Sequence, residues 1–177
     1  GTTVVVSPLI ALQRDQAQAI DGQNVGGAAV LNSTLGKTAR EQTLTDLQNG
    51  AIEFLFLAPE QLANPETLAR VQEARPSLFV VDEAHCISAW GHDFRPDYLA
   101  LGAVIEALGH PRVLALTATA APPIRQEIVE RLGMRDPAIL VQGFDRPNID
   151  LSVERVADKV RKHTALLERV QAAAKPG

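Results

Sequence analysis

The sequence predicts an α/β fold in which helices flank a parallel β-sheet. Short runs of apolar residues recur along the chain, each four or five residues long. Segments whose apolar residues have helical spacing lie between these runs, so the two kinds of segment alternate. Runs that are apolar throughout are typical of strands buried on both faces, and their alternation with helices is typical of a parallel sheet.

Six apolar runs are expected to form strands. They are Thr3–Val6, Ala28–Leu31, Phe54–Leu57, Leu78–Val81, Val113–Thr117 and Ala138–Val141. Five segments between them are expected to form helices, because their apolar residues recur every three or four positions. These helices are Leu9–Ile20, Thr38–Gln48, Glu66–Ala74, Tyr98–Leu108 and Ile124–Leu132. Gly133 directly follows the last one and is expected to cap it.

The carboxyl-terminal part follows a different pattern. A short strand is expected over Ile149–Val153, and a basic amphipathic helix over Val156–Ala174. The sequence contains no internal repeat and no low-complexity segment.

Composition excludes several classes of protein. The 177 residues suffice for about one domain, and 17 basic against 21 acidic residues give a net charge of −4. A protein that coats nucleic acid through a generally basic surface is therefore excluded, and any DNA site must be local. The single cysteine, Cys86, excludes an intramolecular disulfide and is expected to be a packing residue. No apolar run approaches the ~18 residues of a membrane span, so we expect a soluble, cytoplasmic protein.

Two adjacent carboxylates end the fourth apolar run. Asp82 and Glu83 follow Leu78–Val81 directly, at the edge of the sheet where such folds bind ligands. Phosphoryl transfer uses both kinds of acid: one holds Mg²⁺, usually through its water shell, and the other activates the attacking water. We therefore predict that Asp82 binds Mg²⁺ and that Glu83 is the catalytic base. The alternative is a strand end that carries solvated acids.

An aromatic loop follows this acidic pair. It contains Trp90, His92, Phe94 and Arg95. Aromatic side chains in a surface loop can stack on unpaired bases, and an arginine can pair with phosphate. We predict that His92, Phe94 and Arg95 act on DNA, and that Tyr98 packs at the start of the next helix. Trp90 fits either role, because it could instead anchor the loop on the core.

Hydroxyl side chains follow two other expected strands. Ser7 precedes Pro8 and a helix, so it can contact a DNA phosphate or serve as an N-cap. Thr117 and Thr119 end the fifth apolar run, where they are suited to relay the state of a γ-phosphate. Their alternative role is turn formation and helix capping before Pro122.

These segments together resemble the RecQ group of ATP-dependent DNA helicases, in superfamily 2. The string Asp82-Glu-Ala-His85 is shared by many helicases, but the resemblance extends through the aromatic loop to Tyr98. Further matching segments occur in family order over nearly the whole chain. They are Val6–Leu12, Leu31–Thr34, Leu57–Leu62, Ala115–Ala120 and Gly143–Ile149.

The resemblance implies a RecA-like sheet of the P-loop NTPase type. It implies that residues 1–148 are part of a first motor lobe, and that 149–177 are the hinge and opening helix of a truncated second lobe. ATP and Mg²⁺ are the implied cofactors, and single-stranded and duplex DNA are the implied partners. By resemblance, His85 links the nucleotide site to Thr117 and Thr119, although a structural histidine is the alternative. Arg146 lies at the junction of the lobes, where it can bond a carboxylate or DNA.

The sequence lacks the phosphate-binding loop of such motors. Its Gly36-Lys-Thr38 is not preceded by a glycine at the required spacing, because Leu31 stands there. In the family this loop, its strand and its helix come before Val4–Val6. We therefore expect the isolated chain to be nearly inert, and its sheet to have an empty slot beside the acidic strand.

By the same resemblance, the whole enzyme is expected to move 3′ to 5′ along single strands and to separate duplexes in DNA repair or recombination, associated with the nucleoid. Two alternatives remain open from the sequence. One is a lobe of a DEAD/DEAH RNA helicase, which the aromatic loop disfavours. The other is a non-catalytic nucleic-acid-binding module.

Overall fold

The computed structural model describes residues 1–23, 26–88, 93–141, 148 and 153–173. It contains two compact units, Gly1–Ala138 and Ile139–Gly177. The first unit holds the sheet, and the second contains the helix α6 (Lys159–Ala173). The lobe boundary expected after residue 148 stays a prediction.

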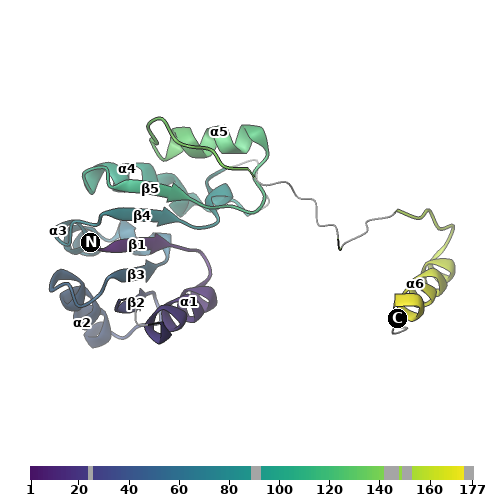
Figure 1. Cartoon of the computed structure of the whole chain (residues 1–177), viewed down its shortest axis with the longest axis horizontal. Helices are drawn as coiled ribbons and strands as arrows, with labels where there is room; N and C mark the ends of the chain where they lie inside the picture. The colour runs from purple at the N-terminus through teal and green to yellow at the C-terminus, as the bar shows by residue number, and fades with distance from the viewer. Residues whose placement is uncertain (24–25, 89–92, 142–147, 149–152, 174–177) are drawn as a thin grey trace. The chain divides into compact units, whose positions relative to one another are not determined.

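The described part of the first unit contains a five-stranded parallel sheet in the order β2-β3-β1-β4-β5 (Figure 1). Each strand pairs in register with its neighbours, so that Val6 lies opposite both Leu57 and Val81. The strands are β1 (Thr3–Val6), β2 (Ala28–Leu31), β3 (Phe54–Leu57), β4 (Leu78–Val81) and β5 (Arg112–Ala115). The expected parallel α/β fold is confirmed, and the first four strands have the bounds expected from the sequence.

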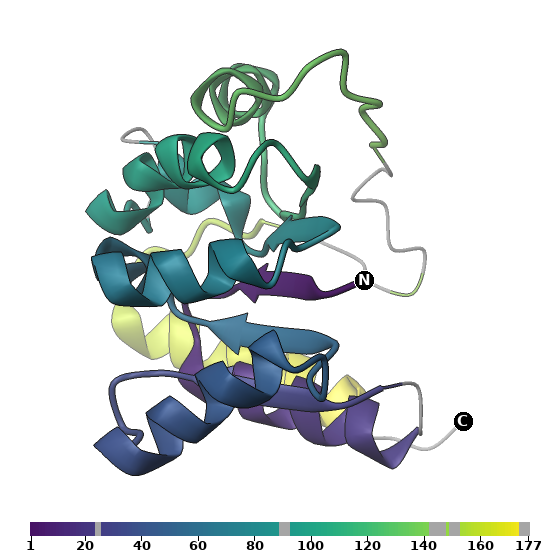
Figure 2. The same cartoon turned by 90° about the vertical axis from the view of Figure 1, so that its left-hand side faces the viewer.

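Because all the strand pairs are parallel, each connection from one strand to the next crosses the sheet and contains an α-helix, and α5 follows the last strand. The α-helices are α1 (Ile10–Gly22), α2 (Lys37–Gln48), α3 (Pro65–Glu73), α4 (Leu101–Ala107) and α5 (Pro122–Arg131). Right-handed crossovers place α1 on one face of the sheet and α2, α3 and α4 on the other (Figure 2). No helix in the described residues is long and apolar enough to cross a membrane.

Three short 3₁₀ helices of the described residues lie in two of the connections between strands, one after β3 and two after β4. They are η1 (Pro59–Ala63), η2 (Ala84–Ile87) and η3 (Pro96–Ala100). The helix expected over Tyr98–Leu108 is therefore divided into η3 and α4. Gly133 caps α5 as expected: its φ is +62°, and Gly133 and Met134 donate backbone hydrogen bonds to Glu130 and Val129.

The main apolar core lies on one face of the three central strands, where buried side chains of α2, α3, α4 and α5 pack against them. Val4, Leu55 and Phe79, one from each central strand, are fully buried. Tyr98 is also fully buried. Phe56 and Val80 are buried on the opposite face, so packing on both faces fixes the positions of the strands' carboxyl ends.

The strand expected over Ala138–Val141 is wrong. These residues form no regular structure, and the side chains of Ile139, Leu140 and Val141 are exposed. An apolar run forms a buried strand only when neighbouring strands pair with it, and no described strand does so here. The strand expected over Ile149–Val153 lies almost wholly outside the described residues.

The empty slot expected beside the acidic strand is also wrong. β4 pairs directly with β1 on one side and with β5 on the other. Among the described residues, β2 and β5 are the two edge strands of the sheet, and no strand pairs with the outer side of β5. Leu114 and Leu116 are exposed there.

An open apolar edge strand promotes association. We expect the chain to self-associate with rising concentration, and Leu114→Lys to weaken the association by placing a charge on β5. Leu99→Lys is the matched control, since Leu99 is similarly exposed, at 40% against 43%, but lies in η3. Sedimentation equilibrium measures the effect. Equal association constants for the two variants would contradict a role for β5.

Candidate nucleotide-hydrolysis site

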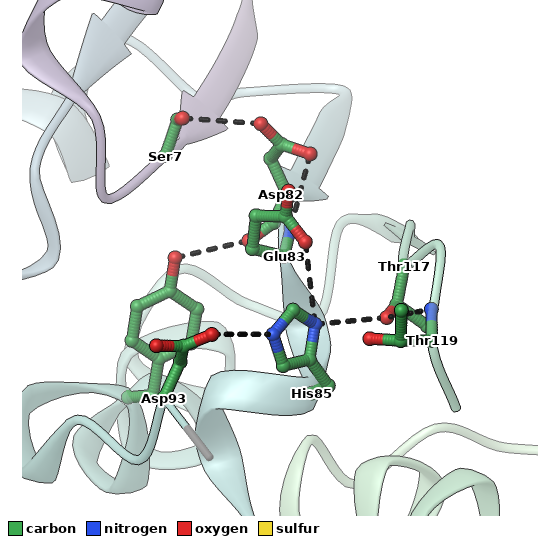
Figure 3. A network of polar contacts seen from close by, with 8 residues as sticks. Ser7, Asp82, Glu83, His85, Asp93, Thr117 and Thr119 are labelled. Carbon is green, nitrogen blue, oxygen red and sulfur yellow. Dashed lines mark hydrogen bonds and ion pairs between the residues drawn. The ribbon is translucent and has the colours of Figure 1, made fainter. Parts of the chain in front are cut away.

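The carboxyl ends of β1, β4 and β5 lie side by side, because these strands are parallel neighbours. Ser7 follows β1, Asp82 follows β4, and Thr117 follows β5. Figure 3 shows how the polar side chains from these three strand ends connect to one another. The sheet thus brings Ser7 to Asp82, 75 positions away, and His85 to Thr117, 32 positions away.

Asp82 is held by two hydrogen bonds. Its Oδ2 accepts from the hydroxyl of Ser7 at 3.1 Å, and its Oδ1 accepts from the backbone N–H of Glu83 at 3.0 Å. Ser7 is completely buried. The N-cap role considered for Ser7 is wrong, because α1 has Leu9 as its N-cap. A contact between Ser7 and DNA stays a prediction, and it would require the hydroxyl to leave Asp82.

Glu83 has a left-handed backbone conformation, with φ 48° and ψ 44°. Such a conformation is uncommon outside glycine and costs on the order of 1–2 kcal/mol. The Glu83 side chain is one third exposed, and its Oε2 lies 3.2 Å from Nδ1 of His85. The carboxylate therefore has access to solvent while its direction is fixed by the histidine.

His85 connects β4 to the end of β5. Its Nδ1 lies 2.9 Å from Oγ1 of Thr117 as well as close to Glu83, and its Nε2 lies 3.8 Å from Oδ2 of Asp93. The Thr117 hydroxyl also accepts a hydrogen bond from the backbone N–H of Thr119 at 3.3 Å. Thr117 thus has both the turn-forming role and the contact with His85, whereas the Thr119 side chain is exposed.

Tyr98 packs at the start of a helix, as expected, but it also makes a contact that the sequence does not reveal. Its hydroxyl donates to the backbone carbonyl of Asp82 at 2.9 Å. Burial raises the pKa of the Tyr98 phenol well above its usual range. Burial likewise raises the pKa of the Cys86 thiol, in agreement with a packing role for that residue.

The end of the aromatic loop lies beside the acidic strand. Phe94 is 39% exposed. Arg95 donates from its backbone N–H to the carbonyl of Cys86 at 2.9 Å, and from Nη1 to the carbonyl of Pro8 at 3.4 Å. The other predicted DNA-contacting residues, Trp90, His92 and Arg146, lie outside the described residues.

Ser88 and Glu127 form a further contact that the sequence does not reveal. Ser88 is buried, and its hydroxyl donates to Oε2 of Glu127 in α5 at 2.6 Å. Glu127 also forms an ion pair with Arg131 at 3.3 Å. The available signal was the position of Glu127 next to Ile128 on the buried face of α5, where a carboxylate needs a partner.

The donor set at the strand ends fits Mg²⁺. Carboxylate oxygens are hard ligands, and Asp82 keeps lone pairs beyond the two that its hydrogen bonds use. Within the described residues, no group of three or more His, Cys, Asp or Glu side chains could enclose a metal. One or two carboxylates with water and phosphate oxygens are the usual environment of Mg²⁺, so a site built on Asp82 would need no further cluster of protein ligands.

Sequence comparison gives consistent matches. Residues 1–127 match the family described as DEAD/DEAH box helicase. The "Probable ATP-dependent DNA helicase RecS" of Bacillus subtilis is 42% identical over 177 residues, covering 100% of this chain and 35% of that protein. The "ATP-dependent DNA helicase RecQ" of Pasteurella multocida is 38% identical over 149 residues, covering 84% and 23%. The chain thus spans about a third or less of these relatives.

Structural comparison supports the fold. The chain is similar to the crystal structure of the Pyrococcus furiosus Hef helicase domain, with a TM-score of 0.56 and 19% identity. The similarity covers 75% of this chain and 27% of that one. The expected RecA-like architecture is confirmed for the sheet and its flanking helices.

The raised pKa of Tyr98 makes the stability of the chain depend on alkaline pH. The phenol ionises near pH 10 in the unfolded chain but at higher pH in the folded protein. The contribution of the Tyr98 phenol to the free energy of unfolding is therefore complete below about pH 10. It is lost as the pH rises above this value, by up to about 1.4 kcal/mol per pH unit. Chemical denaturation from pH 8 to 11 measures the free energy of unfolding.

Tyr98→Phe is the control, because it removes the ionisable group and keeps the ring. We expect the free energy of unfolding to fall less steeply above pH 10 in this variant. The difference between the two proteins isolates Tyr98 from other groups, including Cys86. Identical slopes would show that Tyr98 ionises as easily in the folded state as in the unfolded state.

Proposed function

Because this chain belongs to the DEAD/DEAH box helicase family, with RecQ and RecS helicases as homologues, we propose that it is part of the first motor lobe of an ATP-dependent DNA helicase. The observation that carries the proposal is the pair Asp82 and Glu83 at the carboxyl end of β4, joined by His85 to the end of β5. The complete enzyme would use ATP hydrolysis to move along single-stranded DNA in the 3′ to 5′ direction and to unwind duplexes.

Glu83 is the proposed catalytic base. Its carboxylate is partly exposed and can accept a proton from a water molecule positioned beside it. Asp82 would hold Mg²⁺ through water, and the ion would neutralise the charge of the ATP phosphates. Because Ser7 and the Glu83 N–H bond the Asp82 carboxylate, Asp82 is already oriented before the nucleotide arrives.

His85 and Thr117 form the proposed link between hydrolysis and movement. Nδ1 of His85 contacts both the Glu83 carboxylate and the Thr117 hydroxyl. A change in the position of Glu83 during hydrolysis would therefore alter the contact of His85 with the end of β5. Thr119, whose N–H bonds the Thr117 hydroxyl, would move with this turn.

DNA is the proposed partner on the side of the aromatic loop. Phe94 is exposed enough to stack on a base, and the Arg95 guanidinium lies near the segment after β1. Trp90, His92 and Arg146 are proposed to contribute further DNA contacts. A second motor lobe would complete the site, and the enzyme would act on nucleoid DNA in repair or recombination.

The proposal can be tested in a RecS chimera, in which this chain replaces the matching segment of the Bacillus subtilis relative. We expect Glu83→Gln to retain ATP binding and to lower kcat by about 100-fold or more, because the amide cannot accept the proton. Steady-state ATP hydrolysis gives kcat, and a nucleotide-binding assay gives the affinity for ATP. Glu60→Gln, at an exposed acid in η1, is the control and should leave both unchanged. Comparable turnover in the Glu83→Gln protein would remove Glu83 from the role of base.

Phe94→Ala in the same chimera tests coupling to DNA. Loss of stacking alone would weaken DNA binding by about 1–3 kcal/mol, and saturating DNA would restore full ATP hydrolysis. If the loop instead transmits DNA binding to the acidic pair, DNA should no longer stimulate ATP hydrolysis in this variant, even when DNA is saturating. The hydrolysis measured without DNA should persist. Titration of ATP hydrolysis with single-stranded DNA distinguishes these results. Full restoration at saturation would show that Phe94 provides affinity only.

A further inference from the structure

The peptide bond between Asp82 and Glu83 lies outside the ladder of the sheet. Leu116 donates its N–H to the carbonyl of Val81 at 2.9 Å, and its own carbonyl accepts from the N–H of Ala84 at 2.8 Å. In a regular parallel ladder, Glu83 would make the second of these bonds. One extra residue therefore lies between the two bonds, as in a β-bulge.

Both polar groups of this peptide are bonded by side chains instead of by a strand. The N–H of Glu83 donates to the Asp82 carboxylate at 3.0 Å. The carbonyl of Asp82 accepts from the Tyr98 hydroxyl at 2.9 Å. These two bonds fix the plane of the peptide, and with it the left-handed conformation of Glu83. Because that conformation is intrinsically unfavourable, it depends on such external support.

We propose that Tyr98 is a positioning residue whose hydroxyl sets the direction of the Glu83 carboxylate. The proposal rests on the catalytic role proposed above for Glu83. Without the hydroxyl, the Asp82 carbonyl loses its hydrogen-bond donor, and the peptide between Asp82 and Glu83 can rotate so that the carbonyl accepts a hydrogen bond from another donor. That rotation takes φ of Glu83 from positive to negative values and removes its carboxylate from His85.

Tyr98 also connects this peptide to the end of the aromatic loop. Its N–H donates to the carbonyl of Arg95 at 3.0 Å, and Arg95 in turn bonds the carbonyls of Cys86 and Pro8. A displacement of Arg95 would therefore act on Tyr98, and through its hydroxyl on the peptide before Glu83. This route is separate from the covalent path through η2.

The alternative is that Tyr98 only fills the core. Its ring is completely buried, so removal of the ring would disturb folding under either interpretation. Tyr98→Phe separates the two roles, because it keeps the ring and removes the hydroxyl alone. Thr67→Val is the matched control. Thr67 lies in α3, is also buried, and its hydroxyl accepts a hydrogen bond from Arg40.

The first test is kinetic and uses the RecS chimera. We expect Tyr98→Phe to lower kcat for ATP hydrolysis by about tenfold or more while KM for ATP stays within about twofold. Thr67→Val should change neither value. If Tyr98→Phe has the kcat of the unsubstituted chimera, or if Thr67→Val lowers kcat equally, the inference is wrong.

The second test is structural and uses the present chain without a nucleotide. A crystal structure of the Tyr98→Phe chain should show the peptide after Asp82 rotated and φ of Glu83 negative. Retention of the positive φ would overturn the inference whatever the kinetics. An unsubstituted chimera that does not hydrolyse ATP would instead contradict the proposed function, while a rotated peptide in the chain would still support the positioning role.

Discussion

The parallel pairing of β4 between β1 and β5 is the constraint on which the site depends. Because all three strands run in the same direction and in register, their carboxyl ends meet at one edge. Ser7, Asp82 and Thr117 come together there without any long-range recognition between the side chains themselves. Apolar packing, mainly from the core on one face of the sheet, fixes the strands, so the polar groups are placed to within hydrogen-bonding distance by packing that does not involve them.

The end of β4 shows how folding and chemistry make opposite demands on one segment. A catalytic carboxylate must point away from the sheet toward solvent, whereas buried backbone groups must remain bonded. The bulge at Glu83 meets the first demand by leaving the ladder. The Asp82 carboxylate and the Tyr98 hydroxyl meet the second by replacing the lost strand partners. The unfavourable backbone conformation is thus maintained by neighbours that are themselves held by the core.

The sequence was sufficient for the elements whose signal is local. The first four strands have the expected bounds, since four-residue apolar runs between helical segments leave little freedom. The position of the acidic pair at the end of β4 follows from the same pattern. The hydrogen bonds of Ser7 to Asp82 and of Ser88 to Glu127 were not predictable, because they join residues 75 and 39 positions apart. Such contacts depend on strand order and on loop geometry, which local spacing does not encode.

The strand expected over Val113–Thr117 is present as β5, but it ends at Ala115 and is less buried than expected, and the strand expected over Ala138–Val141 is absent. Both segments are apolar on both faces, which predicts strands with cover above and below. In the structure Leu114 of β5 and Leu116, just after it, are exposed, and no described strand pairs with Ala138–Val141. An apolar run specifies only that its surface should be buried, while pairing requires a neighbour with free backbone groups. β5 forms a strand because β4 pairs with its backbone. The apolar side chain of Leu114 nevertheless stays exposed, because no described residue covers it.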